Sequence, residues 1–244
     1  MLNIANAEDG TIIVEPGEND LSTVAEVYGL FNEVGSCAFA TLDGKGGVES
    51  RIAHFFAGDE DGLYLRTMTV KPFYRQLKKG GKLAVSGEVT TSTIRHDENN
   101  LPIFDPGYMM RVSGDVRELS LEEVNAKAQY NDDFDIAVFD IKKYPETRVF
   151  VLYRFHGEIY AYDYEMHNRD HKLLRERFAF GGDTVEAPGL HINDDCMGCG
   201  ACFENCTFKA IVPGEPYTIN GERCDECGTC FHVCPANAVV SKGL

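Results

Sequence analysis

Two stretches near the carboxyl end decide the organisation of this chain: CMGCGACFENCTFKA at residues 196–210 and CDECGTCFHVCPANA at residues 224–238. Both place four cysteines at the spacing C-x2-C-x2-C-x3-C. An alanine, Ala210 or Ala238, follows each run at the same distance, so the two stretches form an internal repeat. Eight of the nine cysteines lie in this repeat, and only Cys37 lies outside it. The chain therefore divides into a long cysteine-poor part and a short cysteine-rich part.

This spacing is the one that bacterial ferredoxins use to bind two [4Fe-4S] clusters. Three x2-spaced thiolates wrap one cluster, and the fourth cysteine of each run ligates the other cluster. The repeat therefore predicts two crossed sets, which are Cys196, Cys199, Cys202 and Cys234 for one cluster, and Cys206, Cys224, Cys227 and Cys230 for the other.

The resemblance to two-cluster ferredoxins covers about residues 191–241. Its one departure is Thr207, which stands after Cys206 where the second run has Pro235. This change removes no thiolate, so we expect ligation to survive. A pair of four-cysteine zinc sites is the alternative, although zinc sites rarely use this run of spacings.

Composition and charge restrict the partners and the cellular location that we expect for this chain. It has 244 residues, with 23 Lys and Arg against 39 Asp and Glu, and a formal charge of -16. Such a charge repels the nucleic-acid backbone and anionic membranes, so we expect no nucleic-acid partner. No run of about 18 apolar residues is present, and the first residues lack the pattern of a secretion signal. We therefore expect a cytoplasmic protein without membrane insertion.

Hydrophobic periodicity predicts a domain of strands before the cysteine repeat. The predicted strands are at 36–43, 48–58, 62–67, 82–90 and 108–119, with a strand pair within 147–163. The predicted helices are at 21–34, capped by Asp20 or Ser22, at 71–79, after Ser120 with a Ser120–Glu123 capping box, and at 166–178. The many strands and few helices favour a mainly β (α+β) fold, an antiparallel barrel rather than a Rossmann sheet.

These patterns divide the chain into four parts. We expect an N-terminal arm at 1–20, a barrel domain at 21–179, a linker at 180–190 and a small α+β ferredoxin-like domain at 191–244. The linker is expected because three glycines and Pro188 fall within it.

The segments GSCAFATLDGKGGVESRIAHFF (35–56) and LYLRTMTVKPFYRQLKKGGKLAVSGE (63–88) carry a second resemblance. They resemble the FMN-binding split barrel of the pyridoxamine 5'-phosphate oxidase-like family, over about residues 21–165. The resemblance implies that Arg51, Thr67, Thr69 and Lys71 grip the FMN phosphate. A phosphate group needs cations, hydroxyl donors and oriented amides, which these residues and a helix starting near Pro72 would supply.

The resemblance also implies further contacts. Ile52, Ala53 and His54 are expected along the isoalloxazine edge, Gln76 is expected to face the cofactor, and Met68 is expected beside the phosphate residues. Arg111 is expected to reach FMN from the second subunit, because family members are typically homodimers. His54 is also the one candidate for acid catalysis. Each of these residues has an ordinary structural role when taken singly, and their order and spacing together favour FMN.

These features predict a redox protein. We expect an FMN-dependent reductase that receives electrons from a low-potential partner protein and passes them to a small-molecule substrate. Clusters of this class are readily damaged by oxygen, so reduction in an anaerobe fits better than an oxidase. Two alternatives stay open: an electron carrier or redox sensor without catalysis, whose acidic surface docks a basic partner, and a barrel that serves only as a dimerisation scaffold.

Overall fold

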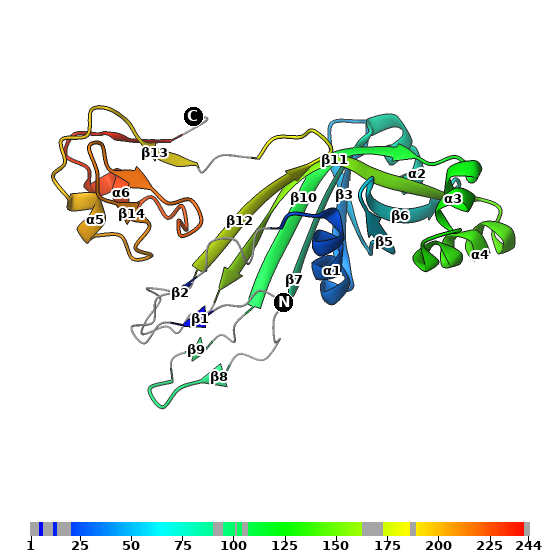
Figure 1. Ribbon diagram of the computed structural model, residues 1–244, viewed down its shortest axis with the longest axis horizontal. Coiled ribbons are helices and arrows are strands. Elements are labelled where there is room, and N and C mark those ends of the chain that lie inside the picture. The colour runs from blue at the N-terminus through cyan, green and yellow to red at the C-terminus, as the bar shows by residue number, and fades with distance from the viewer. Residues whose placement is uncertain are drawn as a thin grey trace.

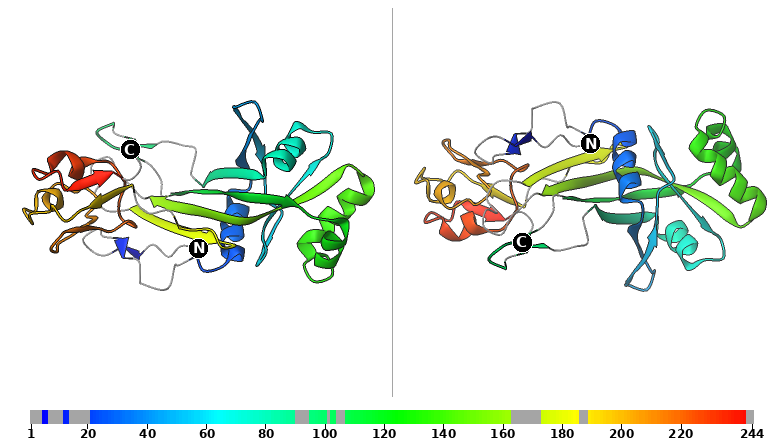
Figure 2. Two further views of the ribbon diagram at one scale, coloured as in Figure 1. Left: turned by 90° about the horizontal axis from the view of Figure 1, so that it is seen from above. Right: turned by 90° about the horizontal axis from the view of Figure 1, so that it is seen from below.

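The computed structural model describes residues 5–6, 12–13, 21–89, 95–100, 102–103, 107–162, 173–185 and 189–241. It has two lobes, one built from a sheet with its helices and one that holds the cysteine repeat (Figure 1). Views from above and below show long strands running from the helical end toward the cysteine lobe (Figure 2). No helix within the described residues is long and apolar enough to cross a membrane.

The first lobe is organised by one eight-stranded antiparallel sheet. Its strands are β3 (Cys37–Leu42), β4 (Val48–Ala53), β5 (Ala57–Asp59), β6 (Gly62–Met68), β7 (Lys82–Val89), β10 (Gly107–Glu118), β11 (Thr147–Tyr162) and β12 (Leu173–Phe180). Their order is β4-β3-β7-β10-β11-β6-β5, with β12 also paired to β11. The predicted mainly β, antiparallel class with a small C-terminal domain is therefore confirmed.

Strands β10 and β11 form the long central ribbon of this sheet. They pair from Gly107 opposite Tyr162 to Glu118 opposite Phe150, with a register shift between Asp115 and Val116. The other edge of β11 has two partners, because residues 147–152 pair with β6 and residues 155–162 pair with β12. One strand thus connects the two ends of the sheet. We call the end around which the helices pack the helical end, and the other end faces the cysteine lobe.

Five helical segments surround the helical end. They are α1 (Val24–Val34), α2 (Pro72–Gly80), α3 (Leu121–Lys127), the 3-10 turn η1 (Asp132–Phe134) and α4 (Asp135–Lys143). The predicted Ser120–Glu123 capping box begins α3. Helix α1 begins at a capping box of Thr23 and Glu26, so the predicted caps Asp20 and Ser22 were wrong by one to three residues. Capping boxes satisfy backbone N–H groups that the first helical turn leaves free.

Two apolar cores hold the lobe together. The larger core joins α1 and α2 to the inner face of the sheet, with Phe31, Phe39 and Phe155 almost fully buried. The smaller core joins α3, η1 and α4 to the other face near β6, around Tyr64 and Phe134. Strand β11 contributes to both cores because its successive side chains point to opposite faces.

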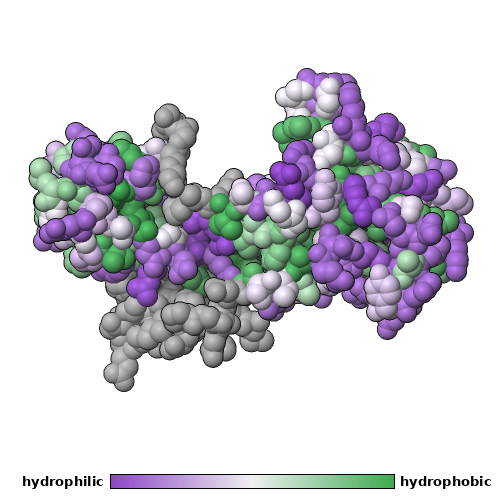
Figure 3. Space-filling view, turned by 45° about the horizontal axis from the view of Figure 1, so that its top comes forward, coloured by the Kyte–Doolittle hydropathy of each residue, from purple (hydrophilic) through white to green (hydrophobic). Residues whose placement is uncertain are grey.

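Beyond the smaller core, the second face of the sheet carries no described helix, and we call it the outer face. Cross-strand partners place one row on it, which runs Ile52, Ala38, Ser86, Arg111, Glu158 and Arg177 from β4 to β12. A neighbouring row of small residues runs through Ser50, Ala40, Ala84 and Ser113. White and green residues gather between the two lobes in the space-filling view (Figure 3).

Three predictions need correction. The helix expected at 166–178 was wrong where the structure describes it, because residues 173–180 form strand β12, and residues 166–172 lie outside the described part. Leu174 and Phe178 face the core while Arg175 and Arg177 face outward, so the two-residue period prevails. The strand pair expected within 147–163 is one continuous strand, β11. Helix α4 was not predicted.

The remaining described strands are short. Strand β1 (Ala5–Asn6) pairs with β2 (Ile12–Ile13), and β8 (Arg95–His96) pairs with β9 (Pro102–Ile103). The other residues of the expected arm at 1–20 lie outside the described part of the chain.

The ribbon leaves no room for a side chain at Gly157. A Cβ atom there would lie 2.3 Å from the Arg111 carbonyl oxygen and 2.7 Å from the Phe178 ring. We expect Gly157→Ala to destabilise the lobe by about 1–3 kcal/mol, because well-packed sites relax poorly around added atoms. Gly29→Ala is the control, since Gly29 lies in α1 with nothing within 4 Å and should gain up to ~1 kcal/mol. Thermal unfolding followed by tyrosine fluorescence checks both, and equal midpoints would contradict the close approach.

Candidate iron-sulfur and cofactor sites

Short elements build the cysteine lobe. Strand β13 (Leu190–Ile192) pairs with β16 (Val239–Ser241), and β14 (Ile211–Val212) pairs with β15 (Thr218–Ile219). Helices α5 (Ala201–Glu204) and α6 (Thr229–Val233) carry the third cysteine of each run. Gly200 and Gly228 precede these helices with φ of 77° and 80°. A residue without Cβ takes this left-handed conformation at little cost, and the chain can then turn sharply between two ligands.

The internal repeat survives in the hydrogen bonds. The amide N–H of Ala210 donates to Sγ of Cys206 at 3.3 Å, and that of Ala238 donates to Sγ of Cys234 at 3.3 Å. The turn after Cys206 keeps this bond although Thr207 replaces proline. Both fourth cysteines therefore accept an equivalent backbone hydrogen bond, which matters because hydrogen bonds to ligand sulfur tune the potential of a cluster.

The fold brings the cysteines together as two crossed groups. The Cys202 thiol lies within electrostatic range of Cys196 and Cys234, from the opposite ends of the repeat. The Cys230 thiol lies within range of three others, which are Cys206, Cys224 and Cys227. These groupings match the predicted sets, and Cys199 stays a predicted ligand of the first.

The donor set fits a polynuclear cluster. Within the described ranges, no three His, Cys, Asp or Glu side chains converge closely enough to hold one metal ion. Cysteines around a [4Fe-4S] cluster each bind a different iron, so their sulfur atoms surround a volume instead of a point. Burial raises the pKa of the Cys230 thiol to about 11, and neighbouring thiols add to the effect. The thiolate form there needs a stabilising cation, which bound iron supplies.

Crossed ligation makes a sharp prediction about pairs of variants. Cys206→Ala combined with Cys224→Ala should remove one cluster and keep about four iron atoms per chain, because both cysteines serve the same cluster. Cys206→Ala combined with Cys196→Ala should remove both clusters. Iron and sulfide analysis after anaerobic purification distinguishes the two. The reverse pattern, with iron retained only in the second pair, would show that each run ligates its own cluster.

One loop of the cysteine lobe docks on the sheet. We call residues 221–226 the docking loop; it includes the predicted cluster ligand Cys224 and ends next to Cys227. The Glu226 carboxylate accepts from Arg177 at 2.7 Å and from the Gly189 amide at 3.0 Å, and it pairs with Arg175 at 2.9 Å. Burial opposes ionisation of Glu226, but the Gly189 amide and the two arginines hold its pKa below the usual range.

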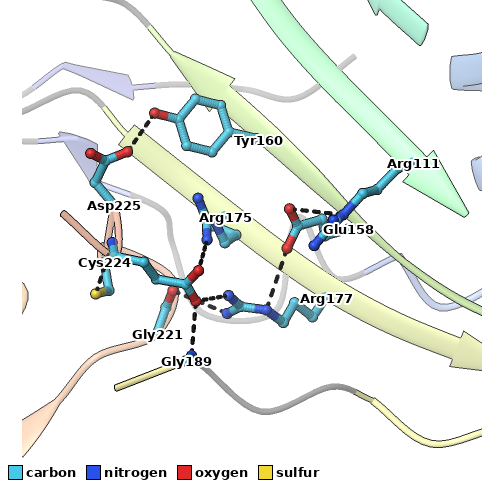
Figure 4. Close-up of polar contacts among 10 residues, drawn as sticks. Arg111, Glu158, Tyr160, Arg175, Arg177, Gly189, Gly221, Cys224 and Asp225 are labelled. Atoms are coloured by element: carbon cyan, nitrogen blue, oxygen red, sulfur yellow. Dashed lines mark hydrogen bonds and ion pairs between the residues drawn. The ribbon is translucent and has the colours of Figure 1, made fainter. Parts of the chain in front are cut away.

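Other contacts extend this docking (Figure 4). The Tyr160 hydroxyl donates to Asp225 at 2.8 Å, and the Arg177 guanidinium donates to the Gly221 carbonyl at 3.4 Å. The Arg177 guanidinium also pairs with Glu158 at 3.5 Å. Neutral, charged and backbone groups thus fix the docking loop on β11 and β12.

Arg175 links this docking to a predicted cluster ligand. Its guanidinium lies within electrostatic range of the Cys224 thiol. The set of Cys206, Cys224, Cys227 and Cys230 is therefore the one whose loop contacts the sheet.

A second polar cluster lies under α2 at the other end of the sheet. The Arg51 guanidinium donates to Oγ1 of Thr41 at 2.7 Å and to Oε1 of Gln76 at 2.7 Å. It also lies 4.3 Å from the centre of the Phe73 ring. Gln76 donates in turn to Glu49 at 2.6 Å. The structure thus joins two residues predicted to contact a cofactor, Arg51 and Gln76. Burial lowers the pKa of Arg51, and Glu49 counteracts this effect.

A pocket of about 450 Å³ adjoins this cluster and is lined in part by Glu49 and Gln76. Three basic side chains that the sequence did not single out, Lys45, Arg75 and Lys79, also line it. Arg75 and Lys79 belong to the helix predicted at 71–79, and only the fold shows that these two cations line one pocket. Positive charge at this place favours an anionic ligand group.

The other residues predicted to bind the FMN phosphate, or to lie beside it, have different surroundings. Thr67 is 5% exposed, and its Oγ1 has no hydrogen-bond partner within the described residues. Thr69 is tied to Glu146 through both its amide and its hydroxyl. Lys71 is exposed and forms the N-cap of α2 without a side-chain cap. Met68 is partly buried and accepts the Lys71 amide at 2.9 Å. A buried hydroxyl without a partner, as at Thr67, is typical of a site that a ligand or water completes.

The residues predicted to border the isoalloxazine ring lie at the edge of the sheet. Ile52 on β4 is 72% exposed, His54 is exposed, and Ala53 packs partly against the larger core. Arg111 is exposed and pairs with Glu158 at 3.2 Å. It lies in the same outer-face row as Ile52 but three strands away, so these two do not meet within one chain.

The docking residues could not be predicted from local sequence patterns. Arg175, Arg177 and Glu226 were not predicted because their partners are about 50 residues apart in sequence. A signal was present in the alternation of LLRERFAF, which places both arginines on one face of a strand.

Residues 190–239 match the family model of the 4Fe-4S dicluster domain. The C-terminal part is therefore an iron-sulfur domain, as predicted, and its chemistry is electron transfer. The match covers about a fifth of the chain. A comparison with curated proteins gives no match.

Solved structures resemble the chain more distantly. A NimC/NimA family protein from Clostridium acetobutylicum is 17% identical, covers 65% of this chain and 92% of its own, and has a TM-score of 0.43. For the heme storage protein HutZ from Vibrio cholerae these values are 14%, 52%, 87% and 0.38. For PhzG from Burkholderia lata, in complex with tetrahydrophenazine-1-carboxylic acid, they are 16%, 67%, 87% and 0.39. Similarity at this level carries no conclusion about ligand or activity.

Proposed function

We propose that this protein is an iron-sulfur flavoprotein that takes low-potential electrons at its cysteine lobe and uses them, through FMN, to reduce a small molecule. The observation that carries the proposal is the docking of the Cys224 loop on the same sheet that holds the Arg51 cluster. A donor domain fixed to the sheet keeps the two redox sites of one chain at a constant, high effective concentration. FMN, when bound, interconverts one-electron and two-electron chemistry.

The residues under α2 support an FMN phosphate at this position. Arg51 supplies a half-buried cation, and Thr67 supplies a buried hydroxyl without a partner among the described residues. Lys45, Arg75 and Lys79 add positive charge around the adjoining pocket. Charge-assisted hydrogen bonds of this kind are about twice as strong as neutral ones. In this proposal Ile52, Ala53 and His54 border the flavin ring, and His54 is the candidate proton donor.

This proposal predicts opposite effects from two neighbouring substitutions. Arg51→Gln should weaken FMN binding at least about tenfold, because the phosphate loses a charged partner. Glu49→Gln should leave FMN binding unchanged or tighten it, because the carboxylate lies 3.5 Å from the same guanidinium. Flavin fluorescence quenching during titration of flavin-depleted protein measures both. Equal affinity of the Arg51→Gln variant and the natural protein would rule out this phosphate site.

Two outcomes would redirect the proposal. Anaerobically purified protein with about eight iron atoms per chain and no affinity for flavin would favour the electron carrier or sensor. If flavin binds and is reduced as fast without the clusters as with them, the cysteine lobe is not the electron donor of the flavin. The Cys206→Ala, Cys196→Ala protein is the matched test for that second point.

We also propose that two chains pair through the outer face of the sheet. Strand β4 lies at the edge of the sheet and exposes Val48 by 67% and Ile52 by 72%. Leu42, opposite Val48 on β3, is 55% exposed. An exposed apolar edge strand beside a face of small residues is a pairing surface.

Val48→Glu tests this pairing, because a charge at the edge should disfavour association. We expect the natural holoprotein to sediment as a dimer. The dissociation constant of the variant's dimer should be at least about tenfold higher. Leu121→Glu is the control, since Leu121 on α3 is 58% exposed and lies away from β4. A monomeric natural protein would overturn the proposed dimer.

A further inference from the structure

The two predicted cluster sites differ in their relation to the sheet. The set of Cys206, Cys224, Cys227 and Cys230 includes Cys224 of the docking loop, and we call it the docked set. The other set, which includes Cys196, contributes no residue to the docking loop, and we call it the Cys196 set. The Arg175 amide of β12 donates to the Glu222 carbonyl at 2.6 Å, two residues before Cys224. The docked set is therefore the one whose surroundings the sheet can influence directly.

The internal repeat allows the two sets to be compared position by position. Between the second and third cysteines, the first run has Gly200 and Ala201, and the second run has Gly228 and Thr229. Oγ1 of Thr229 lies 3.4 Å from Sγ of Cys227. A cysteine that binds iron does so as the thiolate, so the hydroxyl is the donor in the loaded protein. A hydrogen bond to a ligand sulfur favours the reduced cluster, because that state carries one more negative charge.

Positive charge is a second difference between the sets. Glu226 connects Cys224 to the sheet, because its amide donates to Sγ of Cys224 at 3.3 Å while its carboxylate pairs with Arg175 at 2.9 Å. The Arg175 guanidinium lies within electrostatic range of the same thiol. Arg175 is 9% exposed, so salt and solvent screen its charge weakly. A cation held at this place also favours the reduced cluster.

Negative charge lies beside the Cys196 set. Asp194 and Asp195 directly precede Cys196, and no Lys or Arg occurs within residues 190–208. The docking loop carries three carboxylates and one guanidinium group, and Arg175 and Arg177 of the sheet add two more guanidinium groups. The charges around the docking loop therefore balance, whereas those before Cys196 do not.

Burial acts in the opposite direction but differs little between the sets. It disfavours the more negative, reduced state. The third cysteines of both runs are each 8% exposed, and the second cysteines of both runs are exposed. Among the first cysteines, Cys224 is 7% exposed and Cys196 is half-buried. One more buried ligand thus stands against a donor hydroxyl, a nearly buried cation and the absence of an acidic excess.

We propose that the docked set has the higher reduction potential of the two, so that electrons received at the Cys196 set collect next to the sheet. Thr229 and Arg175 are the positioning residues that produce the difference. One electron leaves the Cys196 set and enters the docked set, and a low-potential donor protein is oxidised by one electron to replace it. The inference rests on the iron-sulfur part of the proposed function and not on FMN.

Redox titration of the anaerobic full-length holoprotein tests the order of the two sets. Electron paramagnetic resonance of the reduced clusters gives two midpoint potentials. Thr229→Ala should lower only the higher potential, by about 59 mV, which for one electron is a tenfold change. Ala201→Thr is the matched exchange, because Gly200 and Gly228 hold the same backbone conformation before both positions. It should raise only the lower potential, by offering the same hydroxyl to Cys199.

The contribution of charge is tested by a second group of variants. Arg175→Gln removes the cation and should lower only the higher potential, again by about 59 mV, and Arg175→Lys should restore most of it. Arg117→Gln removes a cation from an exposed pair with Glu123 on β10 and should change neither potential. Iron and sulfide analysis confirms that each variant keeps both clusters. The Thr229 and Ala201 exchanges leave every docking contact intact, so they decide the matter if Arg175→Gln disturbs the docking.

The outcomes separate this inference from the FMN proposal. Two equal potentials in the natural protein, or a Thr229→Ala variant whose lower potential shifts or whose potentials both stay unchanged, would overturn the order of the sets, whatever the flavin content. Expected shifts in a protein without affinity for FMN would overturn the FMN proposal and leave the order of the sets standing.

Discussion

The antiparallel pairing of β10 with β11 is the constraint on which the rest of the molecule depends. At its helical end the ribbon has a core on each face, and at the other end it pairs with β12 and presents charged side chains outward. The register shift beside Val116 joins these two halves, since an extra residue in one strand changes which side chains point to each face. One ribbon therefore supports both the apolar core and the surface on which the cysteine lobe docks.

The docking of the two lobes is mainly electrostatic, and this has a physical consequence. Arg175 and Arg177 are about one-tenth exposed, so each needs a carboxylate partner. Removal of Glu226 would take the carboxylate from Arg175 and leave Arg177 with Glu158 alone. Ion pairs of this kind add less to stability than apolar packing does, but their geometry tolerates few alternatives. The docking loop, which includes Cys224, is thus held in one arrangement on the sheet. A cluster domain on a flexible tether would lack this property.

Features of this chain that depend on local spacing could be predicted from its sequence, and features that depend on contacts between distant residues could not. The cysteine runs predicted an iron-sulfur domain because all ligands of a run lie within eleven residues. The Ser120–Glu123 cap and the helix after Lys71 were confirmed for the same reason. Residues 173–180 were assigned to a helix because LLRERF satisfies both periods, and only pairing with β11 selects the strand. Arg175 acquires its meaning from Glu226, which no local pattern reveals.

The roles predicted for Arg51, Gln76 and Arg111 rest on a resemblance, and the strand order limits how they can act together. From β12 to β4 the sheet crosses five strand spacings, or about 24 Å along a flat sheet. Electron transfer slows steeply with distance, so under the proposed function this span limits how fast electrons from the docking loop would reach a flavin at Ile52. A second chain paired through the proposed outer-face contact would shorten this path by bringing its own β4 over β10 and β11, where Arg111 lies.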